Sequence, residues 1–164
     1  PLNNMIGPNA ERWVPVHGIV AMSDGPACWA EIEALFETCA ERFKAHDVTT
    51  GTLVTTLGTT GYLIEPVFLW PDDLFALHEE SVETGYLKGL KPKPADPAAT
   101  GLVAEARGAV VDVFKRHGAA HFQVGRTYPL AETRSAPTLA LLRSVKQALD
   151  PDNLINPGAL GLGD

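Results

Sequence analysis

Two histidines, His17 and His121, lie in segments whose composition predicts β-strands of one sheet. A neutral imidazole readily takes up a proton near neutral pH, so these two rings, if they meet, would provide a general base. The alternative is that each ring is a satisfied or solvent-facing histidine without a chemical role. The remaining three histidines are expected at helix ends or on helix faces, in structural roles: His46, His78 and His117.

One carboxylate, Glu65, lies inside an apolar strand directly before Pro66. Strand alternation places it on the same face as Leu63 and Val67. An ionised carboxylate is costly to bury unless it is paired. Glu65 is therefore either an acid–base group of a site or a paired residue at a strand edge.

Arg126 directly follows Gly125, at the end of the strand that contains His121, and Tyr128 is close by. The planar guanidinium fork of an arginine matches the two oxygens of a carboxylate, so Arg126 is a candidate clamp for an acidic ligand. The alternative is an ordinary surface arginine. The aromatic rings of Tyr62 and Phe68 could form the wall of a flat ligand site, or belong to the core.

The elements that must position these residues follow from hydrophobic periodicity. Strands are predicted at 12–22, 48–59, 62–70 and 119–125, and helices at 25–45, from 71 onward, at 101–117 and at 136–149. The proline-rich range 88–100 is predicted to be a loop. This order is the split βαβ pattern of a ferredoxin-like antiparallel sheet with helices packed on one face. An α+β fold is therefore expected, as one domain over 1–164 with an added C-terminal helix and an irregular tail.

Composition excludes several classes of protein. The net charge of −7 argues against a nucleic-acid partner, and no apolar run reaches the roughly 18 residues of a membrane span. Dinucleotide, phosphate-loop, zinc and nucleophile-elbow motifs are all missing from the sequence. Cys28 and Cys39 are eleven positions apart on one predicted helix, about 16 Å and too far for a disulfide. They are expected to be buried thiols in a reducing compartment, which favours a cytoplasmic location.

The most specific local pattern is the run Leu-Asp-Pro-Asp-Asn-Leu-Ile-Asn-Pro-Gly at 149–158. Its prolines and glycine predict a fixed, non-helical tail after an apolar helix. Together with the four preceding residues, this run resembles the C-terminal signature of FAD-linked oxidases of the vanillyl-alcohol oxidase type. That superfamily includes D-lactate dehydrogenases and glycolate oxidase. Residues 118–126 lie where many members have a strand ending in Glu-His-Gly-Ile-Gly, and the similarity extends from about Trp13 to the end.

The resemblance implies that this chain is part of a larger protein. In that superfamily an N-terminal domain binds FAD, and a C-terminal domain of ferredoxin-like topology caps the flavin ring and shapes the substrate pocket. Residues 1–164 would be this cap domain, and the FAD-binding domain is absent from them, so the fragment alone is expected to be inactive. The start at Pro1, without a methionine or a targeting signal, fits a cut inside a longer chain.

The sequence departs from the superfamily pattern at the metal site. Members that oxidise 2-hydroxyacids often bind a divalent metal through a His-x-Gly-Asp-Gly-Asn-x-His run and the glutamate of Glu-His-Gly. Residues 61–70 occupy the place of the run without a histidine, and aligning Val124 and Gly125 with Ile-Gly puts His121 at the glutamate position. No metal is therefore predicted. The other register sets Arg126 and Thr127 against an Arg-Thr of phenol-oxidising members, where the arginine lies beside the flavin and a phenolate.

The implied activity is the transfer of a hydride from a small hydroxyacid, or from a phenolic or other alcohol, to FAD. His121 or Glu65 would take the hydroxyl proton, and Arg126 would hold a carboxylate or phenolate and stabilise charge on the flavin. Asn156 and Gly125 would face the cofactor. The substrate pocket would be lined by His17, Tyr62, Phe68 and Tyr128.

The expected partners are a small-molecule substrate and the protein's own FAD-binding domain, with self-association left open. The alternative function is a non-catalytic ferredoxin-like module that binds a ligand or a partner. The missing metal-motif histidines favour this alternative, whereas the intact tail argues against it.

Overall fold

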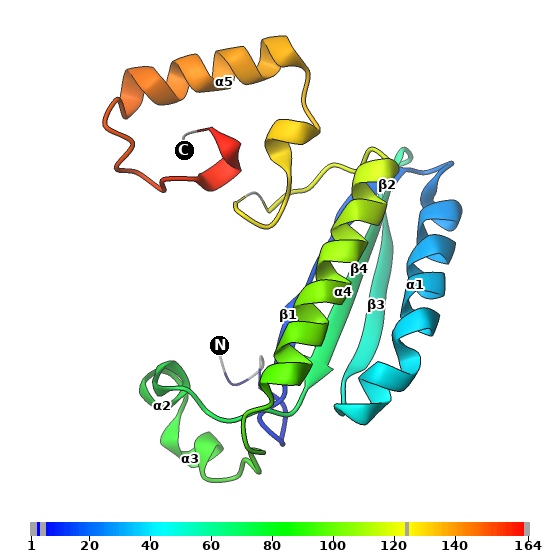
Figure 1. Cartoon of the computed structure of the whole chain (residues 1–164), viewed down its shortest axis with the longest axis vertical. Coiled ribbons are helices and arrows are strands. Elements are labelled where there is room, and N and C mark those ends of the chain that lie inside the picture. The colour runs from blue at the N-terminus through cyan, green and yellow to red at the C-terminus, as the bar shows by residue number, and fades with distance from the viewer. Residues whose placement is uncertain (1–2, 4–5, 124, 163–164) are drawn as a thin grey trace.

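The computed structural model describes residues 3, 6–123 and 125–162. Its centre is an antiparallel sheet of four strands in which the long strand β4 pairs with each of the others. The strands are β1 (Arg12–Pro15), β2 (Gly18–Ala21), β3 (Thr49–Leu57) and β4 (Gly61–Trp70). Helices α1 (Gly25–Ala45) and α4 (Pro97–Arg116) lie side by side over one face of this sheet (Figure 1). The predicted α+β fold, an antiparallel sheet with helices on one face, is confirmed.

The strand predicted over 12–22 is split into β1 and β2, which lie in line along the same side of β4. Pro15 pairs with Val67 and Gly18 pairs with Ile64, so the register is unchanged across the gap. The predicted hairpin is present, since β3 and β4 pair along their full length through a turn at 58–60. Its Gly58 has φ of +61°, a left-handed conformation that favours glycine.

The core lies between the sheet and its two helices. The buried residues of α1 recur every three or four positions, which is the spacing of one helical face. Phe36 and Phe43 of that face meet Phe68 of β4 with ring centroids 5.5 and 6.1 Å apart. Cys28 and Cys39 are free and buried, as predicted, and burial raises the pKa of the Cys28 thiol to about 12. Other buried members of this core are Ile32, Ile64, Val103, Ala106, Val110 and Phe114.

Helix α4 begins at Pro97, four residues earlier than predicted, inside the range assigned to a loop. Asp96 is its N-cap and accepts hydrogen bonds from the amides of Ala98 and Ala99, at 2.9 and 3.0 Å. These amide contacts, first that of Ala99, lower the pKa of Asp96. The pair of a capping aspartate and a proline is a helix start signal that the high proline content of this range obscures.

The helix predicted from Pro71 onward begins only at Ala76, as α2 (Ala76–Ser81), and a separate short helix α3 (Thr84–Leu87) follows. Residues before Ala76 are not helical because Asp72 is buried and forms an ion pair with Arg12 of β1, with 3.2 Å between Nε and Oδ2. This contact ties the segment to the sheet edge. A second small core under these helices contains Ile6, Ala10 and Val82.

The prediction of a strand over 119–125 is wrong, except for one residue pair that does form. Ala120 and Ile19 form an isolated antiparallel bridge, with both backbone hydrogen bonds at 2.8 Å, and the chain then leaves the sheet in a series of bends. Val124 lies outside the described residues. The bridge keeps the place of the fourth ferredoxin-like strand, next to β2, but the ladder ends there.

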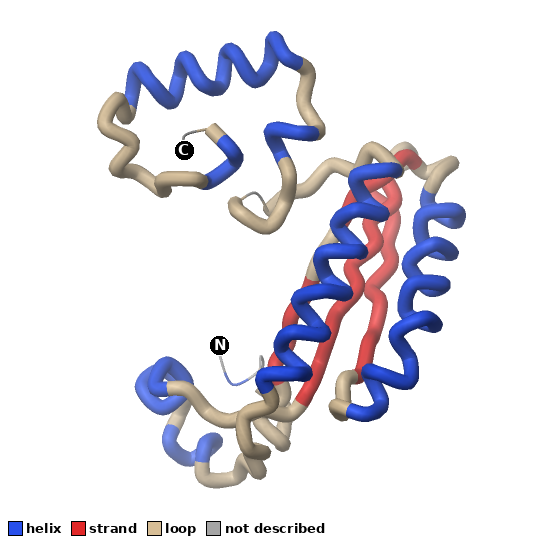
Figure 2. The backbone as a smooth tube through the Cα atoms, viewed as in Figure 1, coloured by secondary structure: helices blue, strands red, loops and turns tan. Residues whose placement is uncertain are grey.

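The segment 130–162 lies apart from the sheet in the tube view (Figure 2). It contains the short turns η2 (Leu130–Glu132) and η3 (Ala159–Gly161) and the helix α5 (Ala136–Leu149), whose bounds are as predicted. No residue of α5 is buried. Large apolar side chains of α5 and the tail are exposed, namely Leu141, Val145, Leu149, Leu154 and Ile155. Among the described helices, none has the length and apolar character needed to cross a bilayer.

His117, at the end of α4, gives the fold a pH dependence. Its ring contacts the carboxylates of Glu31 (2.8 Å) and Asp24 (2.7 Å), and these hydrogen bonds, first that of Glu31, raise its pKa. This stabilisation is therefore complete below about pH 6.5 and is lost as the pH rises through the higher folded-state pKa. We expect His117→Gln to cost about 1 kcal/mol at pH 6 and less at pH 9, measured by urea unfolding. An equal cost at both pH values would contradict this assignment.

Candidate functional site

The candidate site lies at the gap between β1 and β2, where the amide and carbonyl of one residue face the outer edge of the sheet. Opposite the gap, Pro66 of β4 accepts a hydrogen bond from the Val16 amide at 2.9 Å but has no N–H to return. The next residue, His17, lies opposite Glu65 by the register, and its amide and carbonyl face the outer edge of the sheet. A further strand paired along this edge would normally form hydrogen bonds with these two groups. Here side chains form those hydrogen bonds instead.

The His17 backbone is held by two residues of the C-terminal segment. The amide of His17 donates to the Tyr128 hydroxyl at 3.0 Å, and the ring of His121 approaches the His17 carbonyl with its Nδ1 at 2.6 Å. These contacts replace strand pairing at this position. They explain why the ladder stops after Ala120. The predicted meeting of His17 and His121 is confirmed, with ring centroids 5.6 Å apart, although neither residue lies in a strand.

The hydrogen bonds of His17 determine its tautomer. Its Nε2 accepts the amide N–H groups of Phe122 and Gln123, at 3.0 and 3.4 Å, so this nitrogen has no proton. In a neutral ring the proton is then on Nδ1, which donates to the Tyr128 hydroxyl at 2.8 Å. The Tyr128 oxygen therefore accepts two hydrogen bonds from His17, and its own proton remains available for another acceptor.

His121 has a ring nitrogen that can accept a proton. Its Nδ1 faces a carbonyl and so carries the proton, which leaves Nε2 with a free lone pair. Among the described residues, this buried Nε2 has no hydrogen-bond partner. The ring stacks on Tyr128 at a centroid distance of 4.2 Å, so its plane is fixed. Because the nitrogen is covered, a substrate proton reaches it only after a local movement of the covering atoms.

Burial keeps both rings neutral. It lowers the pKa of His17 to about 4, with a smaller effect from His121, and it also lowers the pKa of His121, helped by the charge of Arg134. Burial raises the pKa of Tyr128, and the nearby carboxylate of Glu65 adds to this. The cluster of His17, His121 and Tyr128 therefore presents neutral bases and a neutral phenol at pH 7.

Glu65 lies next to this cluster, on the sheet face opposite the helices. It is half-buried, it pairs with Leu53 of β3 on one side, and it lies opposite His17 on the other. Its negative charge contributes to the raised pKa of Tyr128. The structure thus places the predicted acid opposite His17 in the sheet.

Arg126 and Gly125 lie with the tail rather than with the histidines. The Arg126 guanidinium donates through Nη2 to the carbonyl of Pro157, and the Gly125 carbonyl accepts from the Leu160 amide at 3.0 Å. Asn156 adopts φ of +48°, and its carbonyl accepts from Ala159 in the turn that presents Pro157. The three residues predicted to face the flavin thus form one exposed turn region, next in sequence to Tyr128. An exposed guanidinium with unused N–H groups fits the anionic and carbonyl oxygens of a flavin ring.

Two residues predicted for the substrate pocket lie on the opposite face. Phe68 is fully buried under the helices, and Tyr62 packs against the start of α1, where its Cδ1 would lie 2.4 Å from a Cβ added at Gly25. Strand alternation separates both from Glu65 and His17. Of the four predicted pocket residues, the structure therefore brings together His17 and Tyr128.

Sequence reasoning missed two residues near the site. Phe122 stacks on the His17 ring at a centroid distance of 3.8 Å, although it is itself exposed. Arg107 of α4 contacts Thr127, and its charge acts on Tyr128. The signal for Arg107 is its spacing, because it lies four residues after Val103 and three before Val110 on the buried stripe of α4. Among the described residues, no three His, Cys, Asp or Glu side chains converge on a common metal position.

Three comparisons with known proteins bear on this site. Residues 102–160 match a sequence model of the family described as FAD linked oxidases, C-terminal domain. A comparison with solved structures finds an alkyldihydroxyacetonephosphate synthase at 14% identity and a TM-score of 0.45, covering 90% of this chain. This chain spans only 20% of the length of that protein. A comparison with curated proteins gives no match. Residues 102–160, from α4 through the tail, are thus similar to the C-terminal domain of the FAD-linked oxidases, the family that the sequence of the tail resembles.

Proposed function

We propose that residues 1–164 are the cap domain of an FAD-dependent oxidoreductase. The observation that carries this proposal is the family match over 102–160, which includes Arg126 and the tail turn that it contacts. The same match includes His121 and Tyr128, the two residues that hold His17 in the structure. The proposed site therefore lies where the matched segment meets the sheet.

The proposed substrate is a small hydroxyacid or a phenolic or other alcohol. FAD, when bound, accepts a hydride from the substrate C–H. The unprotonated Nε2 of His121 takes the hydroxyl proton, with Glu65 as the second candidate for this role. Arg126 orients the substrate by binding its carboxylate or phenolate through the guanidinium fork.

The pocket wall is proposed to come from the open face of the sheet and the segment that follows it. Phe122 and Tyr128 flank His17 there, and Glu65 lies on the neighbouring strand. Tyr62 and Phe68, which lie under the helices, are not included. Because His17, His121 and Tyr128 are neutral near pH 7, Arg126 and Glu65 provide the charges of this pocket.

FAD is proposed to be held mainly by an N-terminal domain outside this chain. That domain is the partner we assign to the exposed apolar side chains of α5 and the tail, because burying them would offset the cost of ordering a helix that has no buried residue. Asn156 and Gly125 would then lie at the junction with the cofactor. The two free, buried thiols suit a reducing compartment such as the cytoplasm.

The test is a visible absorption spectrum of the complete parent protein, recorded anaerobically. We expect a flavin spectrum that bleaches on addition of a 2-hydroxyacid or a phenolic alcohol, and the compound that bleaches it identifies the substrate class. A colourless protein that also fails to bind added FAD would contradict the proposal. That result would leave a ferredoxin-like module that binds a ligand or partner.

A further inference from the structure

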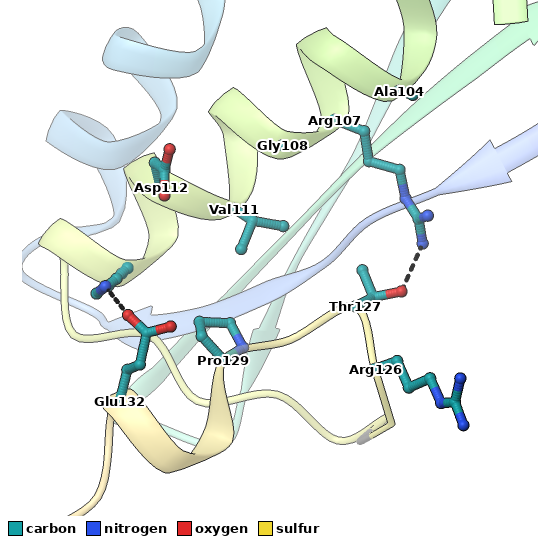
Figure 3. A pocket seen from close by; sticks show the side chains of 10 residues that line it. Ala104, Arg107, Gly108, Val111, Asp112, Arg126, Thr127, Pro129 and Glu132 are labelled. Carbon is teal, nitrogen blue, oxygen red and sulfur yellow. Dashed lines mark hydrogen bonds and ion pairs between the residues drawn. The ribbon is translucent and has the colours of Figure 1, made fainter. Parts of the chain in front are cut away.

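A groove of about 540 Å³ lies between α4 and the segment 126–132 (Figure 3). Its lining contains three basic and two acidic side chains, in a chain whose net charge is −7. Helix α4 supplies Arg107 and Lys115, which are eight residues and therefore about 12 Å apart along the helix axis. The groove thus has two ends with different charge.

The end at Lys115 is neutralised within the protein. Lys115 forms an ion pair with Glu132, and this contact, together with the charge of Asp112, raises the pKa of the lysine. Two carboxylates therefore accompany one ammonium group. This end of the groove has no positive charge to offer to a ligand.

The end at Arg107 has unused hydrogen-bond donors. Its Nε is buried and has no partner among the described residues, and its Nη2 makes only a long contact of 3.4 Å with the Thr127 hydroxyl. A guanidinium has five N–H donors, and a buried donor without an acceptor costs free energy. An acceptor that enters from the groove would remove this cost.

A second positive charge lies close to Arg107. Figure 3 shows Arg107 and Arg126 on either side of Thr127. Arg126 donates one hydrogen bond to the Pro157 carbonyl, and it keeps its charge and its other N–H donors. The two arginines and the threonine hydroxyl therefore form a cationic end of the groove without a carboxylate partner among the described residues.

We propose that this cationic end is a binding site for a small oxyanion, a carboxylate or a phosphate. The planar fork of Arg107 donates two hydrogen bonds to it, the Thr127 hydroxyl donates a third, and Arg126 adds charge. The site is separate from the histidine cluster, because Thr127 contacts Arg107 at the groove whereas Tyr128, the next residue, contacts His17. The site shares Arg126 with the substrate clamp proposed above, but its anion binding is measured without flavin, so its failure is distinguishable from failure of the proposed oxidoreductase function.

The test is an NMR titration of the 164-residue chain with inorganic phosphate and, separately, with acetate at constant ionic strength. We expect saturable shifts of the amides of Gly108 and Thr127, with an affinity at least tenfold weaker in Arg107→Gln. Arg116→Gln is the matched control, because Arg116 is on the same helix and pairs with Glu31 outside the groove. Its affinity should equal that of the unchanged chain. The anion that binds more tightly identifies the class of ligand.

Two results would overturn the proposal: no saturable shift with either anion, or an equal loss of affinity in the Arg107 and Arg116 variants, which would show a general charge effect. If Arg107→Gln does not fold by circular dichroism, Arg126→Gln replaces it, since that side chain is exposed. A loss of at least threefold is expected there. Unchanged binding in that variant would also overturn the proposal.

Discussion

Replacing Arg126 by alanine in the complete flavoprotein is expected to slow the anaerobic bleaching of the flavin by substrate about 10²- to 10³-fold. Removing a charged group that stabilises charge in a transition state costs roughly 3–4 kcal/mol. Arg126 is in the position to do this, because its guanidinium is exposed beside the tail turn and only one of its donors is assigned, to Pro157. Stopped-flow absorbance of the flavin measures the rate.

Two variants separate the chemical role of Arg126 from its contact with the tail. Arg126→Lys keeps the charge but loses the fork, so it should recover part of the rate while the affinity for a carboxylate or phenolate stays weak. Arg42→Ala on α1 is the matched control for loss of an exposed arginine away from the tail, because Arg42 pairs with Glu105 of α4, and its rate should be unchanged. A normal bleaching rate in Arg126→Ala would remove Arg126 from the mechanism.

Replacing His17 by alanine is expected to lower the free energy of unfolding by about 3–4 kcal/mol. The ring is buried, and its loss leaves a cavity and removes one partner of the Tyr128 hydroxyl and the partner of the Phe122 amide. Urea unfolding at pH 7, followed by circular dichroism, measures the difference. His46→Gln is the matched control, since that ring is partly exposed and lies at the far end of α1. It should cost less than 1 kcal/mol.

The same ring predicts a dependence on acid. The pKa of His17 is about 4 in the folded chain and about 6.5 when unfolded, so the unfolded chain binds the proton first. Its contribution to stability is therefore complete above pH 6.5 and is lost as the pH falls toward 4, by about 3 kcal/mol in total. His17→Phe should remove this part of the pH dependence. The same loss between pH 7 and 4 in both proteins would show that His17 does not titrate in this way.

The sheet and its helices are predictable from the sequence because the spacing of apolar residues indicates which side chains are buried. Phe36 and Phe43 recur at helical spacing, and Phe68 alternates along β4, so the core they form is predictable from local pattern. The start of α4 was missed because Asp96 and Pro97 read equally well as a loop. The start of α2 was missed because the Asp72–Arg12 ion pair joins residues sixty positions apart.

The site is predictable only in part. The predicted meeting of His17 and His121 is confirmed, although neither residue lies in a strand, and Glu65 lies in β4 as predicted. The extended strand over 119–125 is wrong because nothing local shows that the Tyr128 hydroxyl and the His121 ring would take the hydrogen bonds of a strand. The side of the sheet on which Tyr62 and Phe68 lie depends on which face the helices cover, and spacing along one strand does not supply this.

Helix α5 has fourteen residues and none of them is buried, which has a consequence for how the chain folds. Isolated helices of about this length are marginal in water, because nucleation is costly and packing normally supplies the stability. The amides of α5 should therefore exchange with solvent far faster than those of α4, which lines the core. Assembly with the proposed FAD-binding domain would then slow exchange in α5 selectively. In this protein, helix α5 would complete its folding only on its partner.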